Sequence, residues 1–140
     1  MVKVTVKSIT NLTFEAVHEP SAIKLTTDAP LDVGGDAASF SPTDLVGTAL
    51  ITCILTTMGL VANKLGLDLS GATGSVEKIM TDSKPRRIAS LVTVLDLPLA
   101  VDQGQREKLE HAAHNCPVHH SLHPDISAEI IFNWQTESLT

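Results

Sequence analysis

Aromatic side chains are scarce in this sequence and tyrosine is absent: phenylalanine and tryptophan together make up 3% of the 140 residues. Since 43% of the residues are apolar, a hydrophobic core is still possible, but it must consist mainly of leucine, isoleucine, valine and alanine. The length is typical of one domain, and we therefore expect a single domain over residues 1–140.

Clustered positive charge is also lacking. The formal net charge is -6, and the one basic cluster is K-P-R-R at residues 84–87. Because proteins that bind nucleic acid need a basic surface, we expect no nucleic-acid partner. Residues 1–7 alternate between polar and apolar and lack the apolar run of a signal peptide. We expect a cytoplasmic protein, a setting in which a lasting structural disulfide is rare and a catalytic disulfide is allowed.

No charged residue occurs in the 19 residues from 45 to 63, a run close in length to a membrane-spanning helix. Glycine and threonine interrupt the run and strand patterns surround it, so we expect no membrane association. The pattern instead favours a helix that is buried on nearly every side. Because one chain of 140 residues hardly covers such a helix, we expect a second copy to help, as in a homodimer.

The order of the predicted elements indicates the fold class. Alternating patterns predict strands over residues 2–7, 12–17, 23–27, 75–82, 88–96 and 127–134. A helix is predicted from the N-cap Ser41 to about Leu65. A second is predicted over residues 103–115, where Asp102 and Gln105 resemble a capping box. Three strands before the long helix and three after it favour an α+β fold over alternating α/β.

The two cysteines have different surroundings. Cys53 lies about three turns into the first predicted helix, beyond the reach of the helix dipole. Apolar burial would raise the pKa of its thiol and leave it inert unless a cation faces it. Cys116 precedes Pro117, which can start a short helical turn, and the backbone N–H groups of that turn would favour its thiolate. Either cysteine could instead be a small buried hydrophobic residue.

The spacing of the cysteines limits their joint chemistry. They are 63 positions apart, which excludes a CxxC motif and a local metal knuckle. If the fold brings them together, the natural product is a reversible disulfide. Histidines surround the second cysteine at positions 111, 114, 119, 120 and 123. His111 and His114 could be drawn as zinc ligands, but no H-E-x-x-H motif accompanies them, and we expect no specific metal site.

Two segments of the chain resemble the cysteine motifs of the OsmC/Ohr family, the osmotically inducible and organic hydroperoxide resistance proteins. The first is F-S-P-T-D-L-V-G-T-A-L-I-T-C with the Gly-Gly loop before it, and the second is R-E-K-L-E-H-A-A-H-N-C-P-V-H-H-S-L. Their order and spacing are those of the family, and the resemblance covers essentially the whole chain. It implies two three-stranded sheet regions around a long buried central helix, in an intertwined homodimer with the long helices back to back.

The resemblance also implies an activity, the thiol-dependent reduction of hydroperoxides in oxidative-stress detoxification. By this analogy Cys53 is the peroxidatic thiol and becomes a sulfenic acid. Cys116 then resolves it as an intramolecular disulfide, which a dithiol reductant reopens. Apolar walls around Cys53 would favour alkyl or lipid hydroperoxides over hydrogen peroxide. No cofactor is implied.

The chain departs from the family pattern in the groups that hold the thiolate. Family members resemble each other in an arginine from the N-terminal sheet or the following loop, whereas here no arginine precedes Arg86. The glutamate ten residues before the first cysteine is replaced by Thr43. Candidate cations from this chain or a partner are Arg86, Arg87, His18 and Lys24, and candidate supporting residues are Thr43, Asp44 and His119. The departures leave a second interpretation open, a non-catalytic dimer that senses redox state or binds small molecules.

Overall fold

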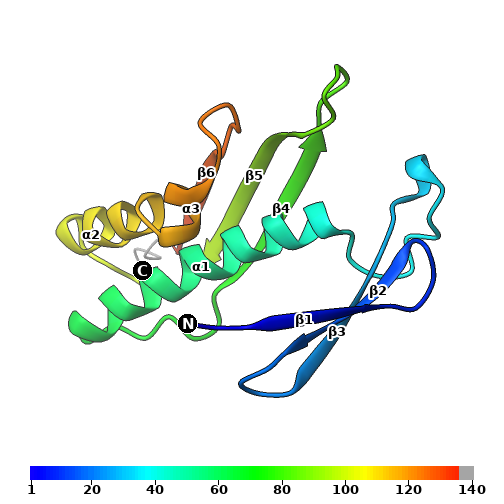
Figure 1. Ribbon diagram of the computed structural model, residues 1–140. Coiled ribbons are helices and arrows are strands. Elements are labelled where there is room, and N and C mark those ends of the chain that lie inside the picture. The colour runs from blue at the N-terminus through cyan, green and yellow to red at the C-terminus, as the bar shows by residue number, and fades with distance from the viewer. Residues whose placement is uncertain (136–140) are drawn as a thin grey trace. The chain divides into compact units, whose positions relative to one another are not determined.

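The computed structural model describes residues 1–135 in two units, one of residues 1–46 and one that begins at Gly47 (Figure 1). The first unit contains an antiparallel sheet in the order β1-β2-β3. Its strands are β1 (Val4–Ser8), β2 (Thr13–His18) and β3 (Ile23–Asp28), and a short 3-10 helix, η1 (Leu31–Val33), follows them. The three predicted N-terminal strands are confirmed, with bounds shifted by one or two residues.

The second unit contains the other three-stranded sheet, in the order β4-β5-β6. Its strands are β4 (Thr73–Met80), β5 (Ile88–Leu97) and β6 (Ile130–Trp134). The strands β4 and β5 are antiparallel, whereas β6 lies parallel to β5. Between β5 and β6 the chain forms two helices, α2 (Gln103–His114) and α3 (Pro117–Ser121). This helical crossover returns the chain to the end of the sheet at which β5 begins, so that β6 can run parallel to β5.

The long helix α1 (Pro42–Lys64) begins and ends as the sequence predicted. At its start the backbone N–H of Ser41 donates to the Asp44 carboxylate at 2.9 Å, and the Asp44 N–H donates to the Ser41 hydroxyl at 3.1 Å. At its end Gly66 adopts a left-handed φ of 69°, which a glycine accepts without strain. These reciprocal hydrogen bonds and the glycine fix which residues form α1.

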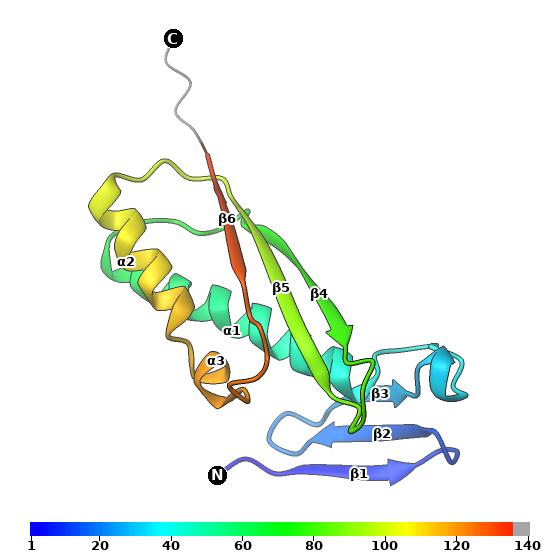
Figure 2. The ribbon, with the colours of Figure 1, turned by 90° about the horizontal axis from the view of Figure 1, so that it is seen from above.

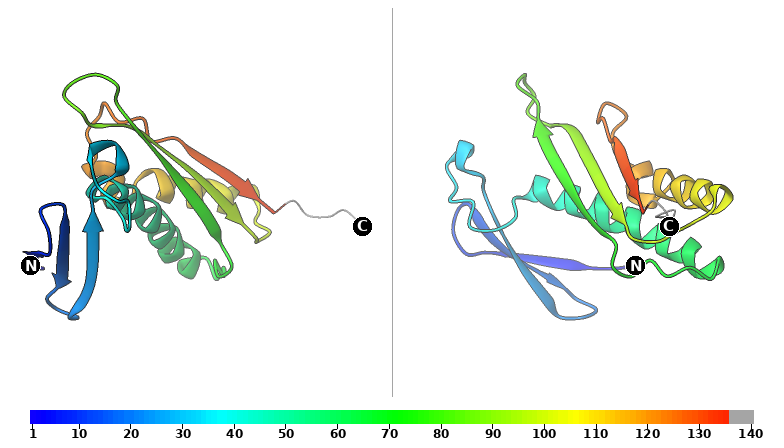
Figure 3. Two further views of the ribbon diagram at one scale, coloured as in Figure 1. Left: turned by 90° about the vertical axis from the view of Figure 1, so that its right-hand side faces the viewer. Right: turned by 180° about the vertical axis from the view of Figure 1, so that it is seen from behind.

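α1 and α2 cover the same face of the β4-β5-β6 sheet (Figures 2 and 3). α1 packs on the sheet at Gly47, where a Cβ atom would lie 3.5 Å from side-chain carbons of Val76 and Leu91. The core of this unit contains fully or almost fully buried aliphatic residues from all three elements. They are Leu50, Ile54 and Met58 of α1, Leu91, Leu95 and Leu97 of β5, and Leu109 and Ala113 of α2. The core is aliphatic, as the scarcity of aromatic residues in the sequence predicted.

Within one chain the burial of α1 is one-sided. Four residues spaced four apart are buried: Leu50, Ile54, Met58 and Ala62. The opposite side carries an exposed stripe of small or uncharged residues: Ala49, Thr52, Thr56, Leu60 and Asn63. The expected burial on nearly every side is therefore only partly met within one chain.

The hydropathy and length of α1 would also suit a membrane-spanning helix, and 28% of its most apolar 18-residue window is buried in the chain. Core helices of soluble proteins pass the same test. Because one side of α1 packs on a sheet and on α2, the structure gives the helix a place in a protein core.

Two predicted strands differ in their bounds. The strand predicted over residues 75–82 is β4, which ends at Met80 because Thr81 closes the turn to β5: the Thr81 N–H donates to the Arg87 carbonyl, and the Arg87 N–H donates to the Thr81 hydroxyl. The strand predicted over residues 127–134 is continuous only from Ile130, because Ser127 forms an isolated bridge with Ser90.

Candidate functional site

The second unit places the two cysteine side chains within hydrogen-bonding distance of each other, and both are free thiols. Cys53 comes from the middle of α1 and is partly exposed. Cys116 comes from the junction between α2 and α3 and is 0% exposed. The core packing of α1 and α2 on one sheet face therefore brings together two thiols that are 63 positions apart in the sequence.

The position of Cys116 follows from the way in which α2 ends and α3 begins. The predicted capping box at the start of α2 is confirmed, with Asp102 and Gln105 bonded to each other's backbone N–H groups at 2.8 and 3.1 Å. After α2 the chain becomes extended at Cys116, and Pro117 occupies the first position of α3. The Cys116 sulfur caps α3 by accepting the N–H of His119 at 3.3 Å, which confirms that this thiol faces backbone N–H groups.

Burial nevertheless dominates the acidity of the second thiol. Loss of solvent raises the pKa of Cys116 above its ordinary value of 9.0, and the Cys53 side chain raises it further, while the N–H groups of His119 and Val118 lower it only in part. The local N–H groups favour the thiolate, as expected from the sequence, but burial outweighs them. Cys116 is thus also the buried residue that the sequence left open as the alternative.

His119 contributes to the site through its backbone and has a perturbed side chain. Burial lowers the pKa of its imidazole below the ordinary 6.5, and the nearby His114 and His120 lower it further. Its ring is therefore neutral near pH 7. The ring lines a small hollow of about 210 Å³ together with Leu122, His123, Pro124, Ile126 and Ala128.

The candidate cations of the second unit lie in the turn between β4 and β5. A guanidinium nitrogen of Arg87 is 3.1 Å from a carboxylate oxygen of Asp125, in the loop before β6. Both side chains are more than half exposed, so this ion pair contributes little to stability. Arg86 precedes Arg87 in the same turn. Any role of either arginine at Cys53 stays a prediction.

The other candidate residues belong to the first unit or to the first turn of α1. Lys24 of β3 lies 3.6 Å from the Glu15 carboxylate, and His18 of β2 lies 2.6 Å from the Ser21 hydroxyl. Thr43 and Asp44 lie in the first turn of α1, where both interact with Ser41, whereas Cys53 lies about three turns into the helix. Their proposed support of the thiolate stays a prediction.

A groove between α1 and α2 was missed by the sequence analysis. It has a volume of about 720 Å³ and is lined by Thr57, Val61, Gly104, Glu107, Lys108, His111, Ala112 and Asn115. Its lining includes Thr57, whose hydroxyl donates to the Cys53 carbonyl at 2.8 Å one helical turn away, and Asn115, which directly precedes Cys116, but neither cysteine itself lines the groove. The sequence contained a signal, since Cys53, Thr57 and Val61 recur every four residues and share one helix face.

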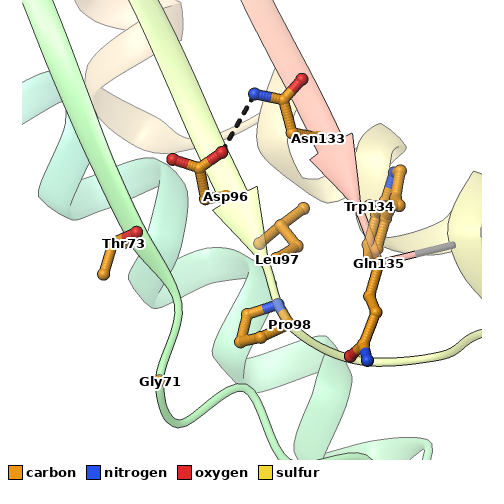
Figure 4. A pocket seen from close by; sticks show the side chains of 8 residues that line it. All are labelled: Gly71, Thr73, Asp96, Leu97, Pro98, Asn133, Trp134 and Gln135. Carbon is orange, nitrogen blue, oxygen red and sulfur yellow. Dashed lines mark hydrogen bonds between the residues drawn. The ribbon is translucent and has the colours of Figure 1, made fainter.

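Another hollow, of about 440 Å³, lies at the ends of the three strands of this unit (Figure 4). Asn133 of β6 donates to the Asp96 carboxylate of β5 at 3.0 Å, and Trp134 forms one wall. The Trp134 indole N–H donates to Glu110 of α2 at 2.8 Å. This hollow shares no lining residue with the groove between α1 and α2.

Metal binding gains no support from the histidines at residues 111–123. Within residues 1–135, no three side chains of His, Cys, Asp or Glu are arranged to hold a metal ion. The site itself offers the chemistry of two adjacent thiols, one partly exposed and one buried, near a groove with apolar walls.

Comparison with known proteins identifies relatives of the chain. Residues 34–131 match the family model OsmC, described as OsmC-like protein. A crystal structure from Psychrobacter arcticus 273-4, of a protein provisionally described as an osmotic stress induced and detoxification response protein, is 34% identical, with a TM-score of 0.90 over 95% of this chain and 96% of that one. No curated protein sequence matches the chain significantly.

More distant structures share the fold. An organic hydroperoxide resistance protein OsmC from Legionella pneumophila is 17% identical, with a TM-score of 0.72 over 95% of this chain and 96% of that one. An organic hydroperoxide resistance protein from Elizabethkingia anophelis is 13% identical, with a TM-score of 0.76 over 96% of both chains. At these identities the likeness shows the architecture, two three-stranded sheets and a long helix.

The raised pKa of Cys116 predicts a pH dependence of stability. Below pH 9 this thiol is protonated in both the folded and the unfolded chain, and its contribution to stability is fully present. As the pH rises through the ordinary value towards the raised one, the unfolded chain loses the proton first and the contribution is lost, by at most about 1.4 kcal/mol per pH unit.

We therefore expect urea unfolding of the reduced protein to show a steeper loss of stability between about pH 8.5 and 10.5 than Cys116→Ser shows, where the buried thiol is replaced by a hydroxyl that does not titrate. Parallel pH profiles would contradict the raised pKa.

Proposed function

This chain belongs to the OsmC-like protein family, and from that premise we propose that it is a thiol-dependent peroxidase that reduces organic hydroperoxides. The observation that carries the proposal is the pair of thiols, Cys53 and Cys116, held within hydrogen-bonding distance of each other. Relatives of the same fold that are described as organic hydroperoxide resistance proteins support a redox role in stress.

We assign the first step to Cys53 because it is the more exposed of the two thiols. Its side chain is partly exposed, whereas Cys116 is 0% exposed and retains its proton more strongly than an ordinary thiol. The Cys53 thiolate attacks the terminal oxygen of the hydroperoxide, an S–O bond forms and the O–O bond breaks. The leaving alkoxide takes a proton and departs as the alcohol. Cys53 becomes a sulfenic acid.

We assign the second step to Cys116 because its sulfur lies next to that of Cys53. Its sulfur attacks the sulfur of the Cys53 sulfenic acid, a disulfide forms, and the hydroxide leaves with the Cys116 proton as water. A dithiol reductant then exchanges with the disulfide, becomes oxidised and restores both thiols. The sum is one hydroperoxide and one dithiol converted to one alcohol, one water and one oxidised dithiol.

The groove between α1 and α2 supports a preference for organic peroxides. Val61 and Ala112 give it apolar walls, and it begins one helical turn from Cys53 at Thr57. An alkyl chain that lies along this groove gains hydrophobic binding energy, about 0.8 kcal/mol for each buried methylene group. Hydrogen peroxide has no such group and gains nothing from the groove.

The exposed stripe of α1 supports a homodimer. Ala49, Thr52, Thr56 and Leu60 are uncharged, mostly small and exposed, and Leu60 is 59% exposed. Small side chains allow two helices to approach closely, as the back-to-back arrangement of the family would require. A partner helix on this stripe would complete the burial of α1.

A non-catalytic dimer that senses redox state or binds small molecules is the second candidate function. The observation in its favour is that Arg87, one of the predicted partners of the thiolate, forms an ion pair with Asp125. In such a protein the thiol pair would form a disulfide slowly and would not turn over.

Variants of the two cysteines distinguish these functions. We expect Cys53→Ser to show no turnover of cumene hydroperoxide above that of a free thiol, because the accessible nucleophile is gone. Cys116→Ser is expected to react once per chain and then stop, because nothing resolves the sulfenic acid. Stopped-flow oxidation of the reduced proteins with cumene hydroperoxide and with hydrogen peroxide measures both steps.

The wild type should react faster with the organic peroxide than with hydrogen peroxide. Unchanged turnover in Cys53→Ser would rule out the proposed peroxidase. A wild-type rate no higher than that of a free thiol would favour the sensing or binding dimer.

A charge in the exposed stripe tests the dimer. In the isolated chain Thr56 is exposed, so Thr56→Glu should fold normally. Between two packed helices the same carboxylate would be buried without a partner, which costs several kcal/mol. Light scattering should therefore give the wild type and the control Thr56→Ser twice the chain mass of 14.9 kDa, and Thr56→Glu the mass of one chain. A dimeric Thr56→Glu would place the interface elsewhere.

A further inference from the structure

The hydrogen bond between the two thiols has a preferred donor, because the Cys116 sulfur already accepts a hydrogen bond from elsewhere. The backbone N–H of His119 points to this sulfur at 3.3 Å. A thiol carries one proton to donate, and its sulfur is a weak acceptor. With the acceptor side engaged by His119, the Cys116 proton is left for the contact with Cys53.

We propose that Cys116 has a role before it resolves the sulfenic acid: its S–H group donates a hydrogen bond to Cys53 and stabilises the Cys53 thiolate that attacks the peroxide. This inference rests on the proposed function, since it concerns the nucleophile of that reaction. It gives the chain an internal source of thiolate stabilisation at a site where the sequence supplies no arginine before Arg86.

Burial makes the donated hydrogen bond effective. Cys116 is 0% exposed, so its proton is not shared with water. A hydrogen bond donated to the charged form of a group favours that form, and in a buried setting the effect is larger than in water. The hydrogen bonds therefore run in series, from the His119 N–H to the Cys116 sulfur and from the Cys116 S–H to the Cys53 sulfur.

The electrostatic surroundings agree with this direction. The pKa of Cys116 is raised, first by burial and then by Cys53, whose charge is the one that acts on it among the described residues. From α3 the neighbouring titratable group is His119, whose own pKa is lowered by burial and by His114 and His120. A neutral imidazole supplies no cation that would draw the proton off Cys116 instead.

The Cys116 S–H proton also takes part in the second step, the formation of the disulfide. Once Cys53 is a sulfenic acid, the Cys116 sulfur attacks it, and the S–H proton leaves with the hydroxide as water. The hydrogen bond thus holds the resolving sulfur close to the nucleophile before and after the first oxidation.

Titration of the Cys53 thiol tests the inference without any peroxide. Thiolate absorbance near 240 nm and the rate of alkylation by iodoacetamide are measured against pH for Cys116→Ser and Cys116→Ala, and Cys53→Ser gives the Cys116 titration alone. The serine hydroxyl can donate to the thiolate and the alanine methyl cannot. We expect the Cys53 pKa to be higher in Cys116→Ala than in Cys116→Ser by about one unit, which is roughly tenfold less thiolate below both values.

Circular dichroism is used to check that each variant is folded. If Cys116→Ala loses its fold, Cys116→Val fills the space without a donor and replaces it in the comparison. Equal Cys53 titrations in the serine and the donor-free variant would overturn the inference, as would a Cys116 thiol that ionises before Cys53. No peroxide is present in this titration. If the variants differ in Cys53 pKa as expected but the peroxidase assay fails, that failure would count against the proposed function alone.

Discussion

The contact between the Cys53 and Cys116 thiols is the interaction on which the rest of the site depends. It needs α1 and the junction between α2 and α3 on the same face of one sheet. α1 packs on β4 and β5 at Gly47, and the helical crossover between β5 and β6 carries Cys116 to that face. A shift of one residue in α1 would rotate Cys53 by about 100° and separate the thiols.

Unequal burial gives two chemically identical side chains different properties. Burial keeps the Cys116 thiol protonated, and the hydrogen bond from the N–H of His119 fixes its sulfur in place. Cys53 remains accessible beside a groove with apolar walls. An accessible nucleophile next to a buried, protonated partner is the arrangement that an oxidation followed by an internal disulfide requires.

The helix ends were predictable because their signals are local. Ser41 caps α1, and Asp102 and Gln105 form a capping box, as their positions in the sequence predicted. The parallel pairing of β6 was not predictable, since strand direction is set by where the crossover returns the chain. The sequence left open for the same reason whether Cys116 is buried: the turn that starts at Pro117 is local, but the burial of the sulfur comes from distant elements. The groove between α1 and α2 likewise exists only once both helices are packed.

The central claim is that Cys53 and Cys116 act as one redox unit within a chain. The most direct measurement is mass spectrometry of the non-reduced, proteolysed protein after treatment of the fully reduced form with one equivalent of cumene hydroperoxide. We expect one peptide pair linked between Cys53 and Cys116, from protein that runs as a single chain on a denaturing gel without reductant, and a dithiol separates the pair again. Cys53 that is converted to sulfinic acid, or left unmodified, while Cys116 remains a free thiol would contradict it.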